Sequence, residues 1–111
     1  MPNLEFETTR NGRVAVIAAT GELDLSGAAV LEAEIERLAA EPDLGTVVLD
    51  MRGLEFMDSS GLRLVVLADM KARETGRRFA LVRGTETVHR VFEITRMSDR
   101  LDFVSSPEEV R

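Results

Sequence analysis

The order of strand-like and helix-like segments constrains the fold of this chain more than any other feature of its sequence. Two strand-like segments come first, joined at Asn11-Gly12, a pair typical of the type I′ turn of a β-hairpin. Segments with helical spacing then alternate with short apolar strands, which indicates parallel strands joined by right-handed crossovers. The sequence therefore predicts an α/β domain in the order ββαβαβαβ. We expect a mixed, mostly parallel sheet of about five strands, with an antiparallel N-terminal edge strand and helices packed on it.

Caps, breakers and apolar spacing predict the element boundaries. The predicted strands cover residues 4–8, 14–18, 46–49, 79–82 and 101–104. Ser26 is the predicted N-cap of the first helix, because its hydroxyl can accept a free backbone N–H. The second helix is predicted from about Leu62 to Thr75 with Gly76 ending it, and the third begins at Gly84-Thr85.

The helices are predicted to bury apolar stripes. The stripe of the first helix consists of Ala28, Leu31, Ile35 and Leu38, and that of the second consists of Leu62, Val65, Val66 and Met70. The third helix has Val88, Val91 and Phe92 at the same spacing. Leu64 and Leu67 lie outside the stripe of the second helix, so they are either buried under the third helix or available to a partner.

Composition limits the chemistry that this chain can perform. It has 111 residues, 14 basic against 20 acidic side chains and a net charge of −6, which argues against direct nucleic-acid binding. With no Cys and one His, thiolate catalysis and Cys- or His-rich metal sites are excluded, and we expect no cofactor. The N-terminus lacks the pattern of a signal peptide, and no apolar run is long enough to span a membrane. We expect one cytoplasmic domain over residues 1–111, without membrane insertion.

Two strand-to-helix junctions, residues 21–26 and 56–62, contain the polar residues of interest. Function in open α/β sheets gathers where strands end and helices begin. Asp58-Ser59-Ser60-Gly61 is consistent with a helix start alone, since Asp and Ser are favoured capping residues. Two adjacent serines are redundant for capping, however, and one hydroxyl can stay exposed. Such a serine, without a base, is a poor nucleophile but a reasonable phosphate acceptor.

A serine hydrolase that uses Ser59 is the least favoured hypothesis. A nucleophile elbow needs Gly-x-Ser-x-Gly, and Met57 occupies the place of the first glycine. The one imidazole, His89, is predicted on the solvated side of the third helix. Asp24 and Asp58 could approach each other, but so small a chain leaves little room for a substrate cleft. We therefore expect no catalysis by this chain.

The segments 21–26 (Gly-Glu-Leu-Asp-Leu-Ser), 47–50 (Val-Val-Leu-Asp) and 56–62 (Phe-Met-Asp-Ser-Ser-Gly-Leu) resemble the STAS domains of bacterial anti-sigma factor antagonists. The resemblance runs from about Glu5 to the C-terminus. It implies that the unmodified protein binds an anti-sigma factor with serine kinase activity and so frees the sigma factor. It also implies that this kinase phosphorylates Ser59, that the modified protein dissociates, and that a PP2C-type phosphatase restores it.

The same resemblance implies a partner-binding surface. Asp24 matches the acidic residue beside the phosphoacceptor, and Arg63 stands where some members have Gly, which bears on which kinase is recognised. The expected partner-binding residues are Asp24, Ser26, Asp58, Ser60, Gly61, Leu62 and Arg63. In an alternative hypothesis the chain is a STAS accessory subunit that binds the ATPase of a lipid-transport ABC complex through the same surface.

Charge is distributed unevenly around Ser59. Residues 22–58 contain ten acids and two arginines, whereas residues 63–83 contain six basic residues and two acids. Solvated helix faces account for most of these side chains. A phosphoserine adds about −1.5 to −2 charges, and the helix dipole should favour it at a helix N-terminus. We therefore expect phosphorylation to act on a partner interface rather than to unfold the domain.

Overall fold

The computed structural model describes residues 3–110 and contains one five-stranded sheet in the order β1-β2-β3-β4-β5. β1 (Leu4–Asn11) and β2 (Val14–Leu23) form the predicted antiparallel hairpin. The predicted type I′ turn is wrong: Asn11 pairs with Val14, so Gly12 and Arg13 make the turn, and of these two only Gly12 has a positive φ. β3 (Thr46–Met57), β4 (Arg78–Val82) and β5 (Phe103–Val104) follow in parallel. The predicted α/β order and antiparallel N-terminal edge are confirmed. The predicted domain 1–111 includes residues 1, 2 and 111, which lie outside the described residues.

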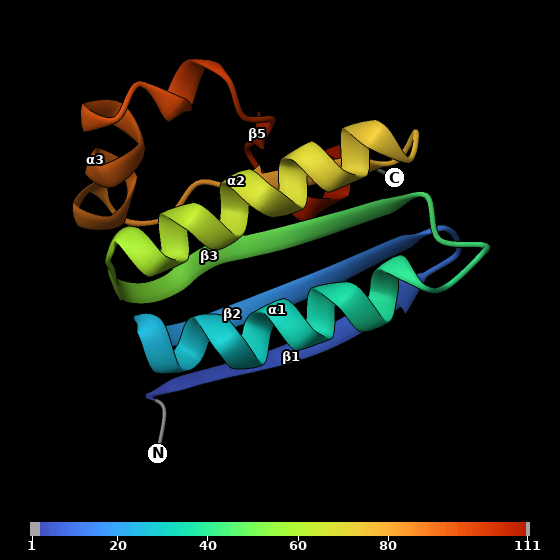
Figure 1. Cartoon of the computed structure of the whole chain (residues 1–111), viewed down its shortest axis with the longest axis horizontal. Helices are drawn as coiled ribbons and strands as arrows, with labels where there is room; N and C mark the ends of the chain where they lie inside the picture. The colour runs from blue at the N-terminus through green and yellow to red at the C-terminus, as the bar shows by residue number, and fades with distance from the viewer. Residues whose placement is uncertain (1–2, 111) are drawn as a thin grey trace.

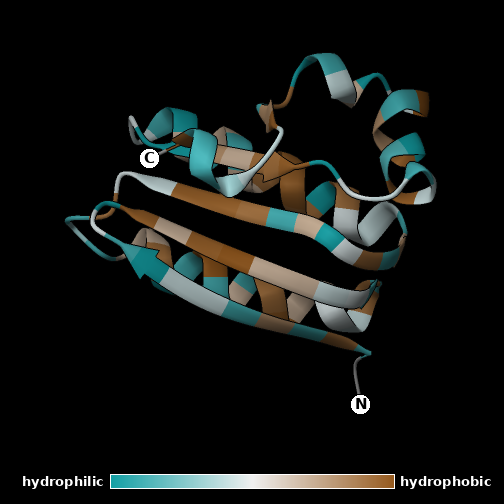
Figure 2. Ribbon diagram, turned by 180° about the vertical axis from the view of Figure 1, so that it is seen from behind, coloured by the Kyte–Doolittle hydropathy of each residue, from teal (hydrophilic) through white to brown (hydrophobic). Residues whose placement is uncertain are grey.

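The helices lie mainly on one face of the sheet. α1 (Leu25–Ala39) and α2 (Ser59–Glu74) run side by side across it, and α3 (Glu86–Ile94) lies beyond α2 (Figure 1). Within residues 3–110 the opposite face carries no α-helix (Figure 2). On that face Val110, in the short 3-10 helix η2 (Pro107–Val110), packs with a valine cluster that includes Val16 and Val48. A second short 3-10 helix, η1 (Met97–Asp99), follows α3.

The β3 strand is much longer than the predicted 46–49. It continues to Met57 because it remains paired with β2 through two register shifts. The extension was not predicted because Asp50 and Arg52 interrupt the apolar run, and charged side chains are uncommon in buried strands. The Asp50 carboxylate is nearly buried and is satisfied by the Arg52 guanidinium at 2.7 and 2.9 Å. Because β3 stays paired with β2 up to Met57, the carboxyl ends of the two strands lie side by side at one end of the sheet.

The stripe predicted for α1 is correct, whereas that of α2 needs correction. Ala28, Leu31 and Leu38 of α1 are buried and Ile35 packs against the core. In α2 the buried residues are Gly61, Leu64 and Val65, whereas Met70 is half exposed. The buried face of α2 differs from the predicted stripe because α2 packs against α1 as well as the sheet, while α3 packs on β3 and η1. The open question about the two leucines is resolved: Leu64 is buried and Leu67 is 45% exposed.

The predicted ends of α2 and α3 are partly confirmed. Gly76 follows α2 with φ of +71°, a left-handed conformation that favours glycine and ends the helix as predicted. Thr85 caps α3 by accepting the Val88 N–H, at the predicted start. The beginning of α2 is different: the helix starts at Ser59 rather than at Leu62. The last strand is shorter than predicted, with only Phe103 and Val104 paired.

The predicted solvated position of His89 is wrong. Its side chain is 5% exposed, and its ring meets that of Phe103 edge-on at 5.0 Å between centroids. Among the described residues, nothing bonds to its Nδ1 atom. The difference arises because β5 brings Phe103 against α3, which widens the buried face of that helix. Burial lowers the pKa of the His89 imidazole, and the charge of Arg83 lowers it further.

This lowered pKa predicts that the free energy of unfolding decreases as the pH falls below about 6.5. The unfolded chain takes up a proton near that pH, whereas the folded chain does so only at lower pH. The contribution of neutral His89 is therefore complete above the unfolded pKa and is lost on acidification. Urea denaturation between about pH 7.5 and 5 measures the decrease.

A His89→Phe variant should lack this decrease over the same range. His89 is the one histidine of the chain, so an NMR titration of its imidazole protons reports the group directly. A measured pKa at or above about 6.5 would contradict its burial in the neutral form.

Candidate functional site

Two helix starts lie next to each other where β2 and β3 end. Leu23 pairs with Met57 in parallel register, and the Asp58 N–H donates to the Leu23 carbonyl at 3.3 Å. Asp24 and Asp58 directly follow these paired residues and have nearly identical extended backbones, with φ of −105° and −108°. The sheet thus brings the two junctions singled out in the sequence together at one edge.

The N-cap predicted for α1 is wrong by two residues. α1 begins at Leu25, and the Asp24 carboxylate accepts the Gly27 N–H at 3.1 Å. Ser26 is exposed in the first turn of the helix instead. Either side chain can cap a helix, and the choice here depends on where pairing with β3 ends β2.

The N-terminus of α2 is capped without either serine hydroxyl. The Asp58 carboxylate accepts the N–H groups of Ser60 and Gly61 at 2.9 and 3.4 Å. Ser59 is the first residue of α2, its side chain is exposed, and its hydroxyl makes no hydrogen bond to any described residue. Ser60 is half-buried. The hydroxyl of Ser59 is therefore available to an external reagent.

Gly61 has a packing role in this junction. It is buried, and a Cβ at this position would lie 2.6 Å from the Met57 Cγ and 2.8 Å from the Leu23 Cγ. Such distances are shorter than van der Waals contact, so any larger residue would push α2 away from the strand ends. Gly61 therefore fixes the position of Ser59 rather than contributing surface. Leu62, also predicted to bind a partner, is half-buried and packs against the main core.

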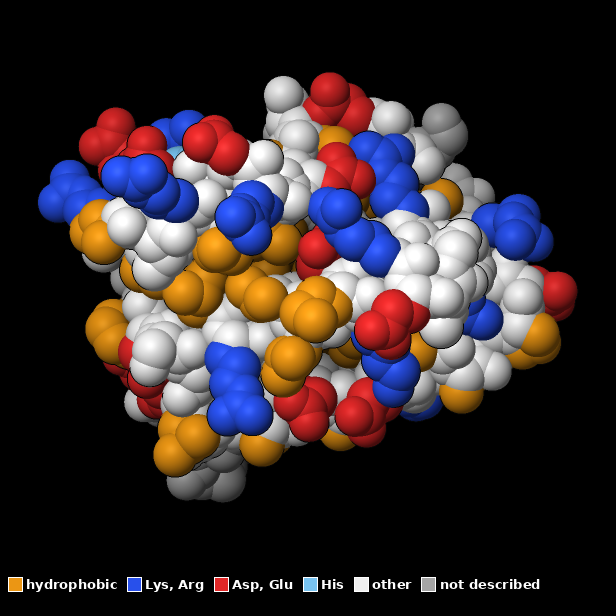
Figure 3. All heavy atoms as spheres, turned by 45° about the horizontal axis from the view of Figure 1, so that its top comes forward, with side chains coloured by type: hydrophobic (Ala, Val, Ile, Leu, Met, Phe, Trp, Pro, Cys, Tyr) orange, Lys and Arg blue, Asp and Glu red, His pale blue; other side chains and the backbone are white. Residues whose placement is uncertain are grey.

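A groove of about 390 Å³ opens beside this junction, between the N-terminal halves of α1 and α2. Five apolar residues line it, Leu25, Ala28, Ala29, Leu64 and Leu67, together with three polar ones, Glu32, Ser60 and Arg63. Two of its three leucines remain in solvent, since Leu25 is 74% and Leu67 is 45% exposed. Hydrophobic side chains gather in the middle of the face viewed in Figure 3, bordered by charged ones. Contiguous exposed apolar surface of this kind is typical of a protein-binding site.

Charged side chains surround the groove on several sides. Asp24 and Asp58 stand at the two helix starts, and Glu32 lies across from Arg63 on its rim. Arg63 is exposed and forms no ion pair with another residue between positions 3 and 110. The surface therefore combines an apolar centre with an arginine that is free to pair with a partner acid.

Leu25 and Phe56 were not among the residues predicted to bind a partner. Leu25 follows the capping Asp24, and Phe56, 44% exposed, precedes Met57 near the end of β3. No local pattern marks them, because Leu23 and Met57, which directly precede the capping aspartates and are equally apolar, are buried. Leu25 lines the groove, whereas Phe56 alternates with the core-facing Met57 along β3 and does not line it.

The helices of residues 3–110 are not membrane-spanning: none of them combines the length and apolarity needed to cross a membrane. In the same part of the chain, no three His, Cys, Asp or Glu side chains are grouped so that they could hold a metal ion.

Comparison with known proteins agrees with this geometry. Residues 6–105 match the family model described as "Mlab, STAS domain". The chain is 30% identical over 80 residues to an anti-sigma F factor antagonist of Lysinibacillus sphaericus, covering 72% of this chain and 68% of that one. It is 25% identical over 93 residues to the corresponding antagonist of Paenibacillus polymyxa, covering 84% and 80%.

Solved structures of anti-sigma factor antagonists have a similar fold. The unphosphorylated form of the anti-sigma factor antagonist SpoIIAA superimposes with a TM-score of 0.81 at 25% identity, covering 96% of this chain and 93% of that one. The phosphorylated form of Bacillus SpoIIAA superimposes with a TM-score of 0.75 at 23% identity, covering 96% of each chain.

Proposed function

The chain belongs to the STAS domain family of anti-sigma factor antagonists, and from this membership we propose that it is a single-domain, cytoplasmic switch protein controlled by phosphorylation of Ser59. The unphosphorylated form binds an anti-sigma factor with serine kinase activity, and the sigma factor is released. Phosphorylation by that kinase ends the binding, and a PP2C-type phosphatase restores it. The chain itself acts as a regulator and catalyses no step.

The single observation that carries this proposal is the state of the Ser59 side chain. Its hydroxyl is exposed at the first residue of α2 and is not used for capping, because Asp58 already accepts the N–H groups that a cap would satisfy. A kinase can therefore reach the hydroxyl without unfolding the helix. SpoIIAA, a relative with the same fold, has been solved in unphosphorylated and phosphorylated forms, which supports a phosphate switch on this fold.

The surroundings of Ser59 supply a physical reason for the loss of binding. A phosphate there would stand beside the carboxylate of Asp58 and on the same sheet edge as Asp24. Asp58 already occupies the free N–H groups of α2, so the helix dipole offers the phosphate less stabilisation than an uncapped helix would. A dianion would also have to be desolvated against a partner surface that covers the exposed leucines of the groove, Leu25 and Leu67. These effects act on the complex rather than on the fold.

Phosphorylation of Ser59 is tested by incubating the chain with candidate anti-sigma kinases and ATP, followed by mass spectrometry of residues 51–71. We expect one phosphoryl group, on Ser59, and none in a Ser59→Ala variant. Ser60→Ala is the matched control, because Ser60 is half-buried and should not compete as acceptor. A phosphoryl group that persists in Ser59→Ala, or a chain that no candidate kinase modifies, would contradict the assignment.

A second candidate function uses the same surface without a phosphate. The apolar groove lined by Leu25, Leu64 and Leu67 also suits a STAS accessory subunit that holds the ATPase of a lipid-transport ABC complex. Affinity purification from the native cell separates the two functions. Recovery of a transport ATPase in place of an ATP-binding kinase would favour the second.

A further inference from the structure

A second groove lies at the opposite end of the helix layer from Ser59. It opens between the C-terminal halves of α1 and α2, above the amino ends of β3 and β4. Its floor and walls are formed by apolar side chains from all four elements and from the segment before β3: Ile35, Ala39, Leu44, Val47, Ala68, Ala72 and Phe79. The amino ends of the parallel strands lie at one end of the sheet, and their carboxyl ends, with Ser59, lie at the other. This groove shares no lining residue with the one beside Ser59.

The size of the groove suits a small apolar group. Its hollow measures about 100 Å³ and is open to solvent on one side. An engineered apolar cavity of about 150 Å³ binds benzene, so this smaller hollow encloses only part of a short hydrocarbon chain, and the rest of the chain lies along its open side. The small side chains of Ala68 and Ala72 leave the space open on the α2 side. Apolar hollows without polar partners hold water poorly, which favours hydrocarbon as the occupant.

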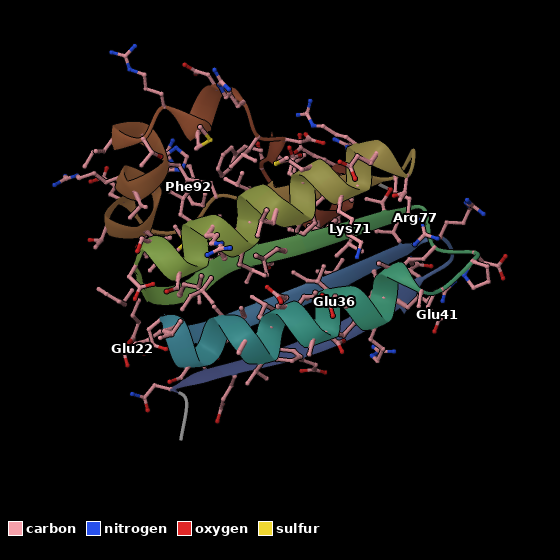
Figure 4. All side chains as sticks on the ribbon, viewed as in Figure 1. Glu22, Glu36, Glu41, Lys71, Arg77 and Phe92 are labelled. Atoms are coloured by element: carbon pink, nitrogen blue, oxygen red, sulfur yellow. The ribbon has the colours of Figure 1, made fainter. Side chains whose placement is uncertain are left out.

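The charges at the mouth select the head group of such a ligand. Lys71 is the one lysine of the chain, its side chain is exposed on the rim, and it forms no ion pair with another described residue. Arg77 lies on the same rim, where its guanidinium donates to the carbonyls of Ala39 and Glu41. Figure 4 shows Lys71 on α2 and Glu36 on α1 on the two sides of the gap between these helices.

The sum of these charges is positive. Arg78 also lines the groove, but the Asp102 carboxylate neutralises it at 2.6 Å. Lys71 and Arg77 then outnumber Glu36, the one acid among the lining residues. An anionic head is therefore attracted to the mouth, and a cationic head is repelled. Lys71 can place its methylene stem along the apolar wall while its ammonium group meets the anion.

We propose that this groove binds an aliphatic carboxylate of about six to eight carbons, with the hydrocarbon tail between α1 and α2 and the carboxylate beside Lys71. The site is independent of the proposed switch at Ser59 and stands or fails separately. It gives the chain a small-molecule ligand at a position where the two helices that frame the partner surface also meet.

Octanoate titration followed by NMR tests this site. Reductive methylation with ¹³C-formaldehyde labels the one lysine and preserves its charge, so Lys71 gives a single side-chain signal distinct from that of the N-terminal amine. We expect this signal to shift saturably, with a dissociation constant of about 0.1–1 mM for so small a ligand. Octylammonium has the same tail with the opposite charge and should bind at least about tenfold more weakly.

Three variants measure the contributions of charge and shape, each assayed through backbone amide shifts. Lys71→Met should weaken octanoate binding about fivefold, and Glu36→Gln should strengthen it because a competing negative charge is removed. Ala68→Leu should abolish binding by filling the hollow. The matched controls Arg90→Met and Glu93→Gln change the same charges on exposed positions of α3 and should have no effect.

Several results would overturn the proposal. Octanoate that causes no saturable shift up to about 10 mM, or octylammonium that binds as tightly, would exclude a carboxylate site. Unchanged affinity in Lys71→Met would do the same. Lys71 is exposed, so this variant should fold even where Ala68→Leu does not.

Discussion

Replacing Ser59 by aspartate is expected to weaken binding to the anti-sigma kinase about 100-fold, which corresponds to about 2.8 kcal/mol. The substitution places a fixed negative charge at the first residue of α2, next to Asp58 and within the apolar surface around Leu25. In the complex this charge would be desolvated without a partner, a situation that typically costs several kcal/mol. Titration calorimetry with the purified kinase, in the presence of ADP, measures the change.

Two controls show whether the loss of binding comes from a negative charge at position 59, rather than from the lost hydroxyl or from added charge elsewhere. Ser59→Ala removes the acceptor without adding charge and should bind like the wild type. Asn11→Asp adds the same charge at the exposed last residue of β1, beside the β1–β2 turn at the other end of the sheet. It should also bind like the wild type. Equal affinities for Ser59→Ala and Ser59→Asp would reject the switch.

Replacing Phe92 by alanine is expected to reduce the free energy of unfolding by about 3–5 kcal/mol. Phe92 is the largest fully buried side chain of the described residues and projects from α3 (Figure 4). Its ring meets that of Phe103 edge-on, with centroids 5.2 Å apart and an interplanar angle of 79°. The substitution would leave a cavity between α3 and β5 and remove this aromatic contact. Urea denaturation monitored by circular dichroism gives the difference.

Ile94→Ala is the matched control, because Ile94 lies on the same helix and is 73% exposed. It should change the free energy of unfolding by less than about 0.5 kcal/mol. A loss of less than about 1 kcal/mol in Phe92→Ala would mean that α3 is held to the sheet by other contacts.

The features of the fold that depend on local chemistry could be predicted from the sequence. Gly12 permits the hairpin, because its φ of +63° suits the tight two-residue turn between the paired residues Asn11 and Val14. Gly76 ends α2 through its left-handed conformation. The order of the segments then determines parallel pairing, since a strand that follows a crossover helix returns in the same direction. None of these inferences requires knowledge of distant contacts.

The errors arose where distant contacts decide. Pairing of Leu23 with Met57 sets the end of β2, and with it the choice of Asp24 rather than Ser26 as N-cap. The position of β5 buries His89, which its neighbours on α3 alone do not require. Packing of α2 against α1 rotates its buried arc toward Leu64. In each case the sequence supplies a residue that could cap a helix or be buried, and its neighbours in the folded structure determine which role it takes.

The candidate site was predictable to a similar degree. The two junctions were recognisable as strand ends with capping residues, and the sheet brings them together. That Asp58 would cap α2 and leave the Ser59 hydroxyl free could not be decided from Asp-Ser-Ser-Gly, in which three side chains can serve as caps. The exposure of Leu25 and Phe56 depends on where the core ends, which no local pattern specifies.

The central claim is that a phosphate on Ser59 ends binding to the anti-sigma kinase without unfolding the domain. It is tested most directly with protein that carries phosphoserine incorporated at position 59. The affinity for the kinase and the urea midpoint of this protein are compared with those of the unmodified chain. We predict an affinity at least about 100-fold lower and an unchanged midpoint. Equal affinity of the two forms, or a loss of binding that follows from unfolding, would contradict the claim.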